Sequence, residues 1–418
     1  METNQNRRCC GIDVHQKTVV VCVLPSDGTP GEPVKKVYGT FRNELTRMRG
    51  WLKQLRVTDI AMESTGVYWR PVWNVLEGHF AHLLLANPKQ VKALQGRKSD
   101  HRDARRIAEF LQDGRLDASF VPPPEIRRLR DLTRCRVTLL GQRDEIHNKI
   151  RDLFETANVK LSSVMCNLLG VSGQRIIQAM VEGQESAEVL SWKLNGKLRP
   201  KEKQVRESLK GCFDEFHRML LAVYWQQYRF LNSQIEAVEA QIALAMEEYA
   251  GLVELLDAIP GVDQIVAWTV IAEMGIDMTV FPDAAHCASW VKLCPGTHES
   301  AGKQMNSSTG HGNRYLRRVL LQAAWAASHS KNTYLRALFY RIKARRGWGK
   351  AIVAVAHKLV IIIYQMLRDR VAYLELGADH FDRINPVRTA RKLVARLERL
   401  GLQVTLQPLQ DDSQPQQT

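Results

Sequence analysis

The sequence lacks the marks of a secreted, zinc-binding or membrane-spanning protein. Its eight cysteines are scattered, without a Cys-x-x-Cys pair or a zinc-type Cys/His spacing, so we expect neither a zinc site nor a disulfide framework. No run of about 18 apolar residues is present, and we expect no membrane span. The first six residues lack the apolar core of a signal peptide. These absences together predict a protein of the reducing cytoplasm.

Acidic residues are in short supply relative to basic ones. The 418 residues, enough for two or three domains, include 59 Lys and Arg against 44 Asp and Glu, a formal net charge of +15. Such an excess attracts polyanions, most often DNA or RNA, because binding releases counterions from the phosphates. The alternative is a basic protein with no nucleic-acid role.

Residues 1–124 have the pattern of an α/β domain. Three β-rich runs separated by turns predict an antiparallel meander, and two later apolar runs, each followed by a helix, predict buried strands. These five runs are residues 9–13, 18–24, 34–41, 60–63 and 81–86. Apolar residues at helical spacing predict a helix over 43–55. This order is typical of an RuvC-like (RNase H-like) domain, which the prolines at 122–124 would end.

The remainder is predicted to be mainly helical. Residues 125–250 hold two long helical stretches, 125–160 and 203–250, around an irregular segment, and indicate either a coiled-coil arm or an ordinary helical bundle. Residues 251–375 are predicted to form a mainly α domain with helices at 313–328 and 333–373 and a polar loop at 292–312. Residues 376–418 predict a basic helix followed by a Gln-rich disordered tail.

A helix-hairpin-helix-like segment lies at residues 256–275. Backbone amides in such a turn can hold a phosphate. Here Asp263 stands where a second glycine is expected, and its negative charge opposes phosphate. We therefore expect this segment to serve packing between two helices.

Four carboxylates are the strongest candidates for a metal site: Asp13, Glu63, Asp100 and Asp103. Asp13 and Glu63 each end an apolar strand, where sites gather in α/β sheets. Asp100 and Asp103 share one face of a predicted helix behind the N-cap candidate Ser99. Oxygen donors of this kind suit Mg²⁺ or Mn²⁺ in phosphoryl-transfer sites. Ordinary helix capping is the alternative for Asp100 and Asp103.

Clustered arginines predict where nucleic acid would bind. Guanidinium groups suit bidentate phosphate contacts, although a solvated helix face is the usual explanation of any single basic run. Several runs in one chain favour contact with the nucleic-acid backbone without base readout. The residues predicted to bind nucleic acid are Arg127, Arg128, Arg130, Arg134, Arg314, Arg317, Arg318, Arg345, Arg346 and Trp348.

Seven short stretches, in this order along the chain, resemble the IS110/IS1111 family of transposases, the RNA-guided "bridge" recombinases. The stretches are residues 11–17 (GIDVHQK), 62–69 (MESTGVYW), 98–105 (KSDHRDAR), 259–262 (IPGV), 290–296 (WVKLCPG), 299–302 (ESAG) and 310–318 (GHGNRYLRR). Residues 160–215 show no such likeness.

The resemblance implies an RuvC-like domain whose four metal-binding acids correspond to Asp13, Glu63, Asp100 and Asp103, and a C-terminal transposase domain whose nucleophilic serine corresponds to Ser300. It further implies donor and target DNA, a non-coding bridge RNA that pairs with both, and dimers that assemble to a tetramer, with the metal site and the serine supplied by different protomers. Such elements imply a bacterial or archaeal, nucleoid-associated protein. In the family the serine is followed directly by glycine, whereas this chain has Ala301 between Ser300 and Gly302.

Three functions remain open from the sequence. The first is a metal-assisted DNA recombinase that forms a phosphoserine intermediate. The second is a metal-dependent RuvC-like nuclease of the Holliday-junction resolvase type, without a serine nucleophile. The third is a non-catalytic RNA-binding scaffold. Ser307, Ser308 and Thr309 are other hydroxyl-bearing residues of the same loop. The order of the motifs, with the acids first and Ser300 late, favours the recombinase.

Overall fold

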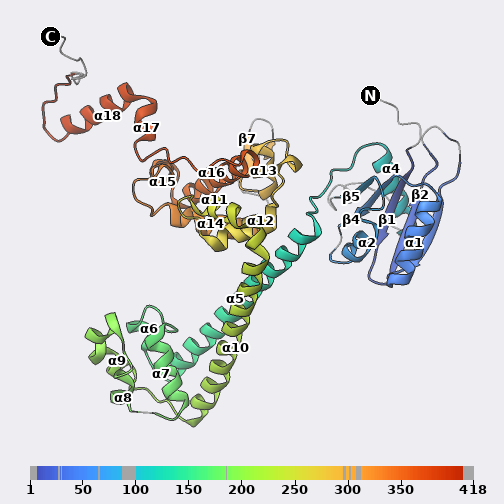
Figure 1. Cartoon of the computed structure of the whole chain (residues 1–418). Helices are drawn as coiled ribbons and strands as arrows, with labels where there is room; N and C mark the ends of the chain where they lie inside the picture. Colours follow the sequence, from blue (N-terminus) through green and yellow to red (C-terminus); the bar gives the residue numbers. More distant parts are fainter. Residues whose placement is uncertain are drawn as a thin grey trace. The chain divides into compact units, whose positions relative to one another are not determined.

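The computed structural model divides the chain into two compact units, Met1–Pro122 and Pro123–Thr418 (Figure 1). It describes residues 7–26, 29, 31–64, 66–86, 100–184, 186–294, 298–300, 303–306 and 312–407. For residues 100–102, 197, 298–300 and 303–306 the backbone alone is described.

The first unit is built on a five-stranded sheet in the order β3-β2-β1-β4-β5. Strands β1, β2 and β3 form an antiparallel meander, and β4 and β5 continue the sheet in parallel with β1. The strands are β1 (Cys9–Val14), β2 (Thr18–Val23), β3 (Val34–Gly39), β4 (Asp59–Glu63) and β5 (His82–Ala86). The predicted meander followed by alternating strands and helices is therefore confirmed.

Helices cover both faces of this sheet, and the strand residues alternate between them. Ile12 and Met62 pack in the core under α1 (Arg42–Gln54) and α2 (Trp69–Leu76). Cys9 and Ala61 face the opposite way, into a core formed with α4 (Asp100–Gln112). A residue of odd number in β1 or β4 thus belongs to the α4 face.

The second unit contains a pair of antiparallel helices, α5 (Pro124–Thr156) and α10 (Glu215–Met246), which lie side by side in Figure 1. The start of α5 and the end of α10 share one core, to which Ile126 and Met246 belong. The end of α5 and the start of α10 share another, to which Phe154 and Leu221 belong. The two helical stretches are confirmed, and their use as a coiled-coil arm stays a prediction.

The sequence predicts an irregular segment between these helices. In the structure this segment instead forms a helical cap with its own core. The cap consists of α6 (Leu161–Val164), α7 (Val171–Val181), α8 (Ala187–Ser191), the 3-10 helix Gly196–Lys201 and α9 (Glu202–Ser208). The second long helix also begins at Glu215 rather than at residue 203. Gly211 explains the break, because a Cβ atom there would lie 2.4 Å from the Ala157 carbonyl oxygen. The chain passes too close to the end of α5 for a helix to continue.

The remaining helices surround one large core. They are α11 (Ala250–Asp257), α12 (Gln264–Met274), α13 (Ala284–Val291), α14 (Arg314–Ala327), α15 (Tyr334–Arg346) and α16 (Trp348–Asp369), followed by α17 (His380–Ile384) and α18 (Pro386–Glu398). Among the described helices, α16 is the one long and apolar enough to cross a membrane by composition. Its buried residues, such as Val355 and Leu359, belong instead to this core.

Three expectations for this region are corrected or refined. Residues 333–373 form two helices rather than one, because Gly347 adopts a φ of 82° that ends α15 and starts α16. The loop at 292–312 contains a two-stranded hairpin of β6 (His298–Ser300) and β7 (Lys303–Asn306). The basic helix is confirmed as α18, and residues 408–418 of the predicted tail lie outside the described chain.

The turn between α11 and α12 has the packing role expected of it. Gly261, with a φ of 87°, lies so close to α14 that a Cβ atom would be 2.4 Å from the Ala323 carbonyl oxygen. The Asp263 carboxylate accepts a hydrogen bond of 2.8 Å from the backbone N–H of Val266 and thereby caps α12. The acid that replaces glycine therefore serves the helix.

Candidate functional site

Helix α4 packs directly on the backbone of β1. A Cβ atom on Gly11 would lie 2.1 Å from the Ala104 carbonyl oxygen and 2.5 Å from the backbone nitrogen of Ala108. Only glycine allows this approach. Gly11 therefore fixes the height and position of α4 over the sheet.

The direction of α4 is fixed at its other end. Arg7, which precedes β1, donates hydrogen bonds to the carbonyl oxygens of Leu111 at 3.1 Å and Gln112 at 3.3 Å. The C-terminal end of α4 thus lies at the start of β1, and Ala104 lies near its middle. Consequently the first turn of α4, which contains Asp100 and Asp103, extends toward the carboxyl ends of β1 and β4.

Asp13 and Glu63 lie at the same edge of the sheet. Each directly follows a residue of the parallel pair Ile12–Met62, and both have the odd numbering of the α4 face. The Asp13 residue is 8% exposed, and its Oδ2 lies 3.1 Å from Nε2 of His15. Strand register and alternation therefore place Asp13 and Glu63 together at this edge, on the face of the sheet that α4 covers.

The donor types at this edge suit a hard divalent cation, because all four predicted ligands are carboxylates. Among the side chains that the structure describes, no three of His, Cys, Asp or Glu lie together closely enough to hold a metal ion. Asp13, Glu63 and Asp103 belong to that set and do not form such a group, whereas the side chain of Asp100 lies outside it. The Asp103 carboxylate, 31% exposed, lies 4.0 Å from a guanidinium nitrogen of Arg106.

The segment that carries Ser300 leaves and re-enters the helical core at adjacent points. A Cβ atom on Gly312 would lie 2.6 Å from the Val291 carbonyl oxygen, and Arg317 donates a hydrogen bond of 2.7 Å to the Lys292 carbonyl. Within the segment, Ser300 pairs with Lys303 across the hairpin. The side chains of Ser300, Ser307, Ser308 and Thr309 lie outside those described.

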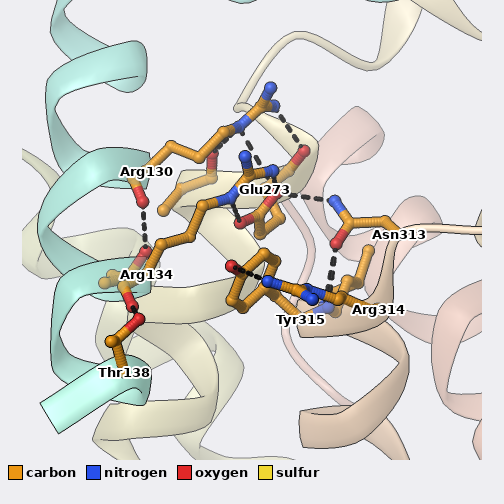
Figure 2. A network of polar contacts seen from close by, with 10 residues as sticks. Arg130, Arg134, Thr138, Glu273, Asn313, Arg314 and Tyr315 are labelled. Atoms are coloured by element: carbon orange, nitrogen blue, oxygen red, sulfur yellow. Dashed lines mark hydrogen bonds and ion pairs between the residues drawn. The ribbon is translucent and has the colours of Figure 1, made fainter. Parts of the chain in front are cut away.

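A buried carboxylate joins this segment to the arm. Glu273 of α12 is fully buried and accepts two hydrogen bonds from Arg134 of α5, at 2.7 and 2.8 Å (Figure 2). Asn313 donates a third hydrogen bond of 2.6 Å and at the same time caps α14. Arg130 donates to the backbone carbonyls of Ala272 and Glu273, and its Nε lies 3.4 Å from the Glu273 carboxylate. The network fixes α5, α12 and the start of α14 together.

This network changes the interpretation of two predicted nucleic-acid contacts, Arg130 and Arg134. Arg130 and Arg134 bind Glu273, so both guanidinium groups have partners inside the protein. The pKa of Arg134 stands above its ordinary value, because the hydrogen bonds and negative charge of Glu273 outweigh the lowering effect of burial. Arg128 is exposed on the same helix and Arg127 is half-buried.

The other predicted contacts lie in a stretch without negative charge. Thirteen Lys and Arg residues, and no Asp or Glu, lie between Glu299 and Asp369. Arg314, Arg318, Arg345 and Arg346 are exposed there, and Arg317 is half-buried. We call this stretch the acid-free region. Its absence of acid is visible in the sequence and is a stronger electrostatic signal than any single arginine run.

Trp325 is a residue of this region that the motifs did not reveal. Its ring centroid lies 5.5 Å from that of Trp348 and 4.2 Å from that of His329. Trp325 and Trp348 are 47% and 51% exposed. The sequence marks Trp325 only by its place, with Trp348, in a stretch without acidic residues. Helical periodicity does not predict that residues 325 and 348 are in contact.

Comparison with known proteins agrees with this arrangement. A family model described as transposase, of the IS110 DEDD type, matches residues 10–158, and a model of the transposase IS116/IS110/IS902 family matches residues 253–341. The transposase for insertion sequence element IS1111A of Coxiella burnetii is 25% identical over 87% of this chain and 90% of its own. The insertion element IS110 uncharacterized 43.6 kDa protein of Streptomyces coelicolor is 32% identical over 34% of this chain and 35% of its own.

The two matched ranges together cover more than half of the chain, and they contain the acidic edge and the hairpin segment respectively. Both ranges match models of the same transposase family, in the order in which the two units hold their candidate site residues. The chain belongs to the IS110 family of transposases.

Proposed function

We propose that this transposase cuts and rejoins DNA strands through a covalent phosphoserine intermediate on Ser300, with metal assistance from Asp13, Glu63, Asp100 and Asp103. The observation that supports the proposal is that Asp13 and Glu63 end neighbouring parallel strands at one edge of the sheet, and that the close contact at Gly11 holds α4 over the same face. Mg²⁺ or Mn²⁺ would be the metal.

In the proposed reaction the four acids would hold divalent cations at the sheet edge. When bound, divalent cations would neutralise charge on the phosphate and stabilise the attacking and leaving oxygens. Buried Asp13 has its carboxylate oriented by His15, which keeps one oxygen in a fixed position. The edge therefore supplies orientation and negative charge rather than a nucleophile.

Ser300 would supply the nucleophile. Its hydroxyl oxygen loses a proton and forms a bond to phosphorus, while one bridging P–O bond breaks and the departing sugar oxygen takes up a proton. The phosphoserine ester retains the energy of the broken bond, so a second sugar hydroxyl can displace the serine and rejoin the strand. The closed base of the segment, at Val291 and Gly312, supports this role because it limits where the hairpin can move.

We propose the acid-free region as the principal nucleic-acid surface, for donor and target DNA. Its exposed arginines would contact phosphates, and the Trp325–Trp348 pair offers flat apolar rings beside them. Backbone contacts of this kind carry no sequence information. Choice of sequence would come from a bridge RNA that pairs with both DNAs, a proposal supported by the resemblance of the motifs and by protein contacts that need not read bases.

The protein is proposed to act as a homo-oligomer, with dimers assembling to a tetramer. Support comes from α10, where exposed Phe216, Val223, Phe230, Ala237 and Leu244 recur every seven residues on the side away from α5. Apolar residues at this spacing occupy one of the two core positions in each heptad of a coiled coil with another long helix. We further propose that the protein works in the cytoplasm, associated with the nucleoid, as its positive charge suggests.

Strand cleavage by matched variants would test the proposed reaction. With the co-purifying RNA, labelled duplexes and Mg²⁺, we expect Asp13→Asn and Ser300→Ala each to abolish cleavage while binding of DNA and RNA survives. Ser307→Ala is the matched control for Ser300→Ala and should cleave normally. Cleavage that survives Ser300→Ala and disappears with Asp13→Asn would favour a plain metal nuclease. Cleavage that survives both would exclude the proposed site.

A further inference from the structure

A groove beside the helical cap brings cationic and aromatic side chains together in a part of the described chain to which no role has been given. The groove has a volume of about 770 Å³ and is lined by α7, by the residues that follow α8 and by α10. It lies between the two ranges that match the transposase models. Neither matched range therefore assigns a role to the groove.

The lining combines positive charge with aromatic surface. Arg175, Lys193 and Arg229 line the groove together with one acid, Glu182, and none of the three cations forms an ion pair with another residue that the structure describes. Trp192 stands at the groove with 66% of its surface exposed. An exposed tryptophan next to three cations is costly to leave in water and suits a ligand that has both a flat ring and negative charge.

Fixed polar groups lie at the base of the groove. The Trp225 ring nitrogen donates a hydrogen bond of 2.6 Å to Oε1 of Gln178, whose Nε2 in turn donates to Glu182 at 2.6 Å. Trp225 also stacks on Tyr228 with an interplanar angle of 11°. Because these contacts hold Gln178 and Trp225 in place, the base of the groove is rigid before any ligand arrives.

We propose that this groove binds an unpaired segment of nucleic acid. One base would stack on Trp192, and the flanking phosphates would contact Arg175 and Arg229. Stacking on an aromatic ring beside cationic side chains is the usual way in which single strands are held, whereas a duplex keeps its bases covered. The choice of partner rests on the proposed function, and the groove adds to the acid-free region a second site with a different preference.

An acidic peptide would satisfy the cations but would leave Trp192 exposed. A duplex would satisfy the cations without offering a ring to the tryptophan. Both alternatives therefore predict that Trp192 is dispensable for binding. The exposed ring decides between the ligand classes, and the experiment is built around it.

The test is fluorescence anisotropy of the full-length protein with labelled single-stranded RNA of about 12 nucleotides, single-stranded DNA of the same sequence and the corresponding duplex. The first variant is Trp192→Ala, and the second combines Arg175→Glu with Arg229→Glu. The control combines Lys201→Glu with Lys203→Glu, two exposed positions outside the groove lining that carry the same change of charge. All these positions are exposed, so the fold should survive, and a circular-dichroism melt checks this.

We expect Trp192→Ala to weaken single-strand binding about tenfold without changing its salt dependence. The groove charge reversal should weaken it at least as much and reduce the salt slope by about 1.4, the value for two phosphate contacts on a single strand. The control should change affinity far less. Tighter binding of RNA than of DNA would identify RNA as the source of the unpaired segment, and the reverse would identify displaced DNA.

Equal losses for the groove reversal and the control would show that net charge alone acts, and would overturn the proposal. So would unchanged binding by Trp192→Ala, or displacement of the single strand by an acidic peptide with equal effect in wild type and Trp192→Ala. If the groove proposal is wrong, strand cleavage by the wild-type protein is still expected. If the proposed reaction is wrong, the cleavage assay shows it, while the affinities for single strands are unchanged. The two outcomes are therefore distinguishable.

Discussion

The Glu273 carboxylate accepts two hydrogen bonds from the Arg134 guanidinium, at 2.7 and 2.8 Å. These bonds cross the boundary between the helical arm and the transposase core. The geometry is bidentate, which is the strongest arrangement for this pair of groups. Glu273 lies directly before Met274, the last residue of α12, and Arg134 lies on the long helix α5. Together with the contacts of Arg130, this ion pair thus holds α5 against the end of α12.

Replacement of Glu273 by Gln should destabilise the second unit by about 2–3 kcal/mol. The change leaves Arg130 and Arg134 without their counter-charge, and the cost is below that of a fully buried pair because the Arg134 side chain is 31% exposed. Thermal unfolding of the full chain measures the loss. The matched control is Glu239→Gln, which removes the ion-pair partner of Arg136. Glu239 is more exposed than Glu273, so this change should cost less than about 1 kcal/mol. Equal effects of the two substitutions would contradict the structural role given to Glu273.

Replacement of Gly11 by Ala should displace α4 and disable the acidic edge. The added Cβ would meet backbone atoms of Ala104 and Ala108, which cannot move without the whole helix. We expect lower thermal stability of the first unit together with loss of strand cleavage. Gly50→Ala on α1 is the control, because nothing lies within 4 Å of its Cβ position. In a helix interior this change should stabilise by about 0.5–1 kcal/mol and leave cleavage intact. Normal cleavage by Gly11→Ala would show that α4 need not be held by this contact.

Charge reversal at Arg345 and Arg346 should weaken binding to duplex DNA. The loss of two phosphate contacts predicts a reduction of the salt slope by about 1.8, twice the value for one contact on a duplex. Titrations at several salt concentrations give the slope. The combined Arg175→Glu and Arg229→Glu variant changes charge equally and should leave duplex binding nearly unaltered. A slope that changes equally for both variants would argue against a localised surface in the acid-free region.

Phe230→Glu should reduce the mass of the assembly in solution. Phe230 is 61% exposed and occupies the centre of the seven-residue apolar repeat on α10, so a charge there opposes a helix–helix seam. Sedimentation or light scattering gives the mass. Ala243→Glu adds the same charge at an exposed position of α10 that is not three or four residues from any member of the repeat, and its assembly should be unchanged. An unaltered mass for Phe230→Glu would place the oligomer contact elsewhere.

Local sequence patterns predicted much of the fold. Alternation and turn residues gave the strands of the first unit to within about one or two residues, and helical periodicity gave α5, α14 and α18. Two predicted helices were too long, because in the structure a close backbone contact or a positive φ ends the helix. Gly211 at Ala157 and Gly347 at a φ of 82° are both of this kind, and periodicity contains no signal for them.

The site was predictable in its composition but not in its connections. The four acids could be named because strand ends and a helix start are recognisable locally. The ion pairs of Arg130 and Arg134 with Glu273 could not be predicted, because 139 residues separate Arg134 from Glu273 in the sequence. For the same reason the contact between Trp325 and Trp348, and the groove that α7 forms with α10, became visible only in three dimensions.

The proposed reaction requires that a serine of the β6–β7 segment forms the covalent bond to DNA. The most direct measurement is to trap the protein–DNA adduct with Mg²⁺, digest both partners and identify by mass spectrometry the residue that carries a nucleotide. We expect one modified residue, Ser300, and no adduct when metal is removed or when Asp13→Asn is used. A nucleotide on any other residue, or efficient cleavage with no adduct at all, would contradict it.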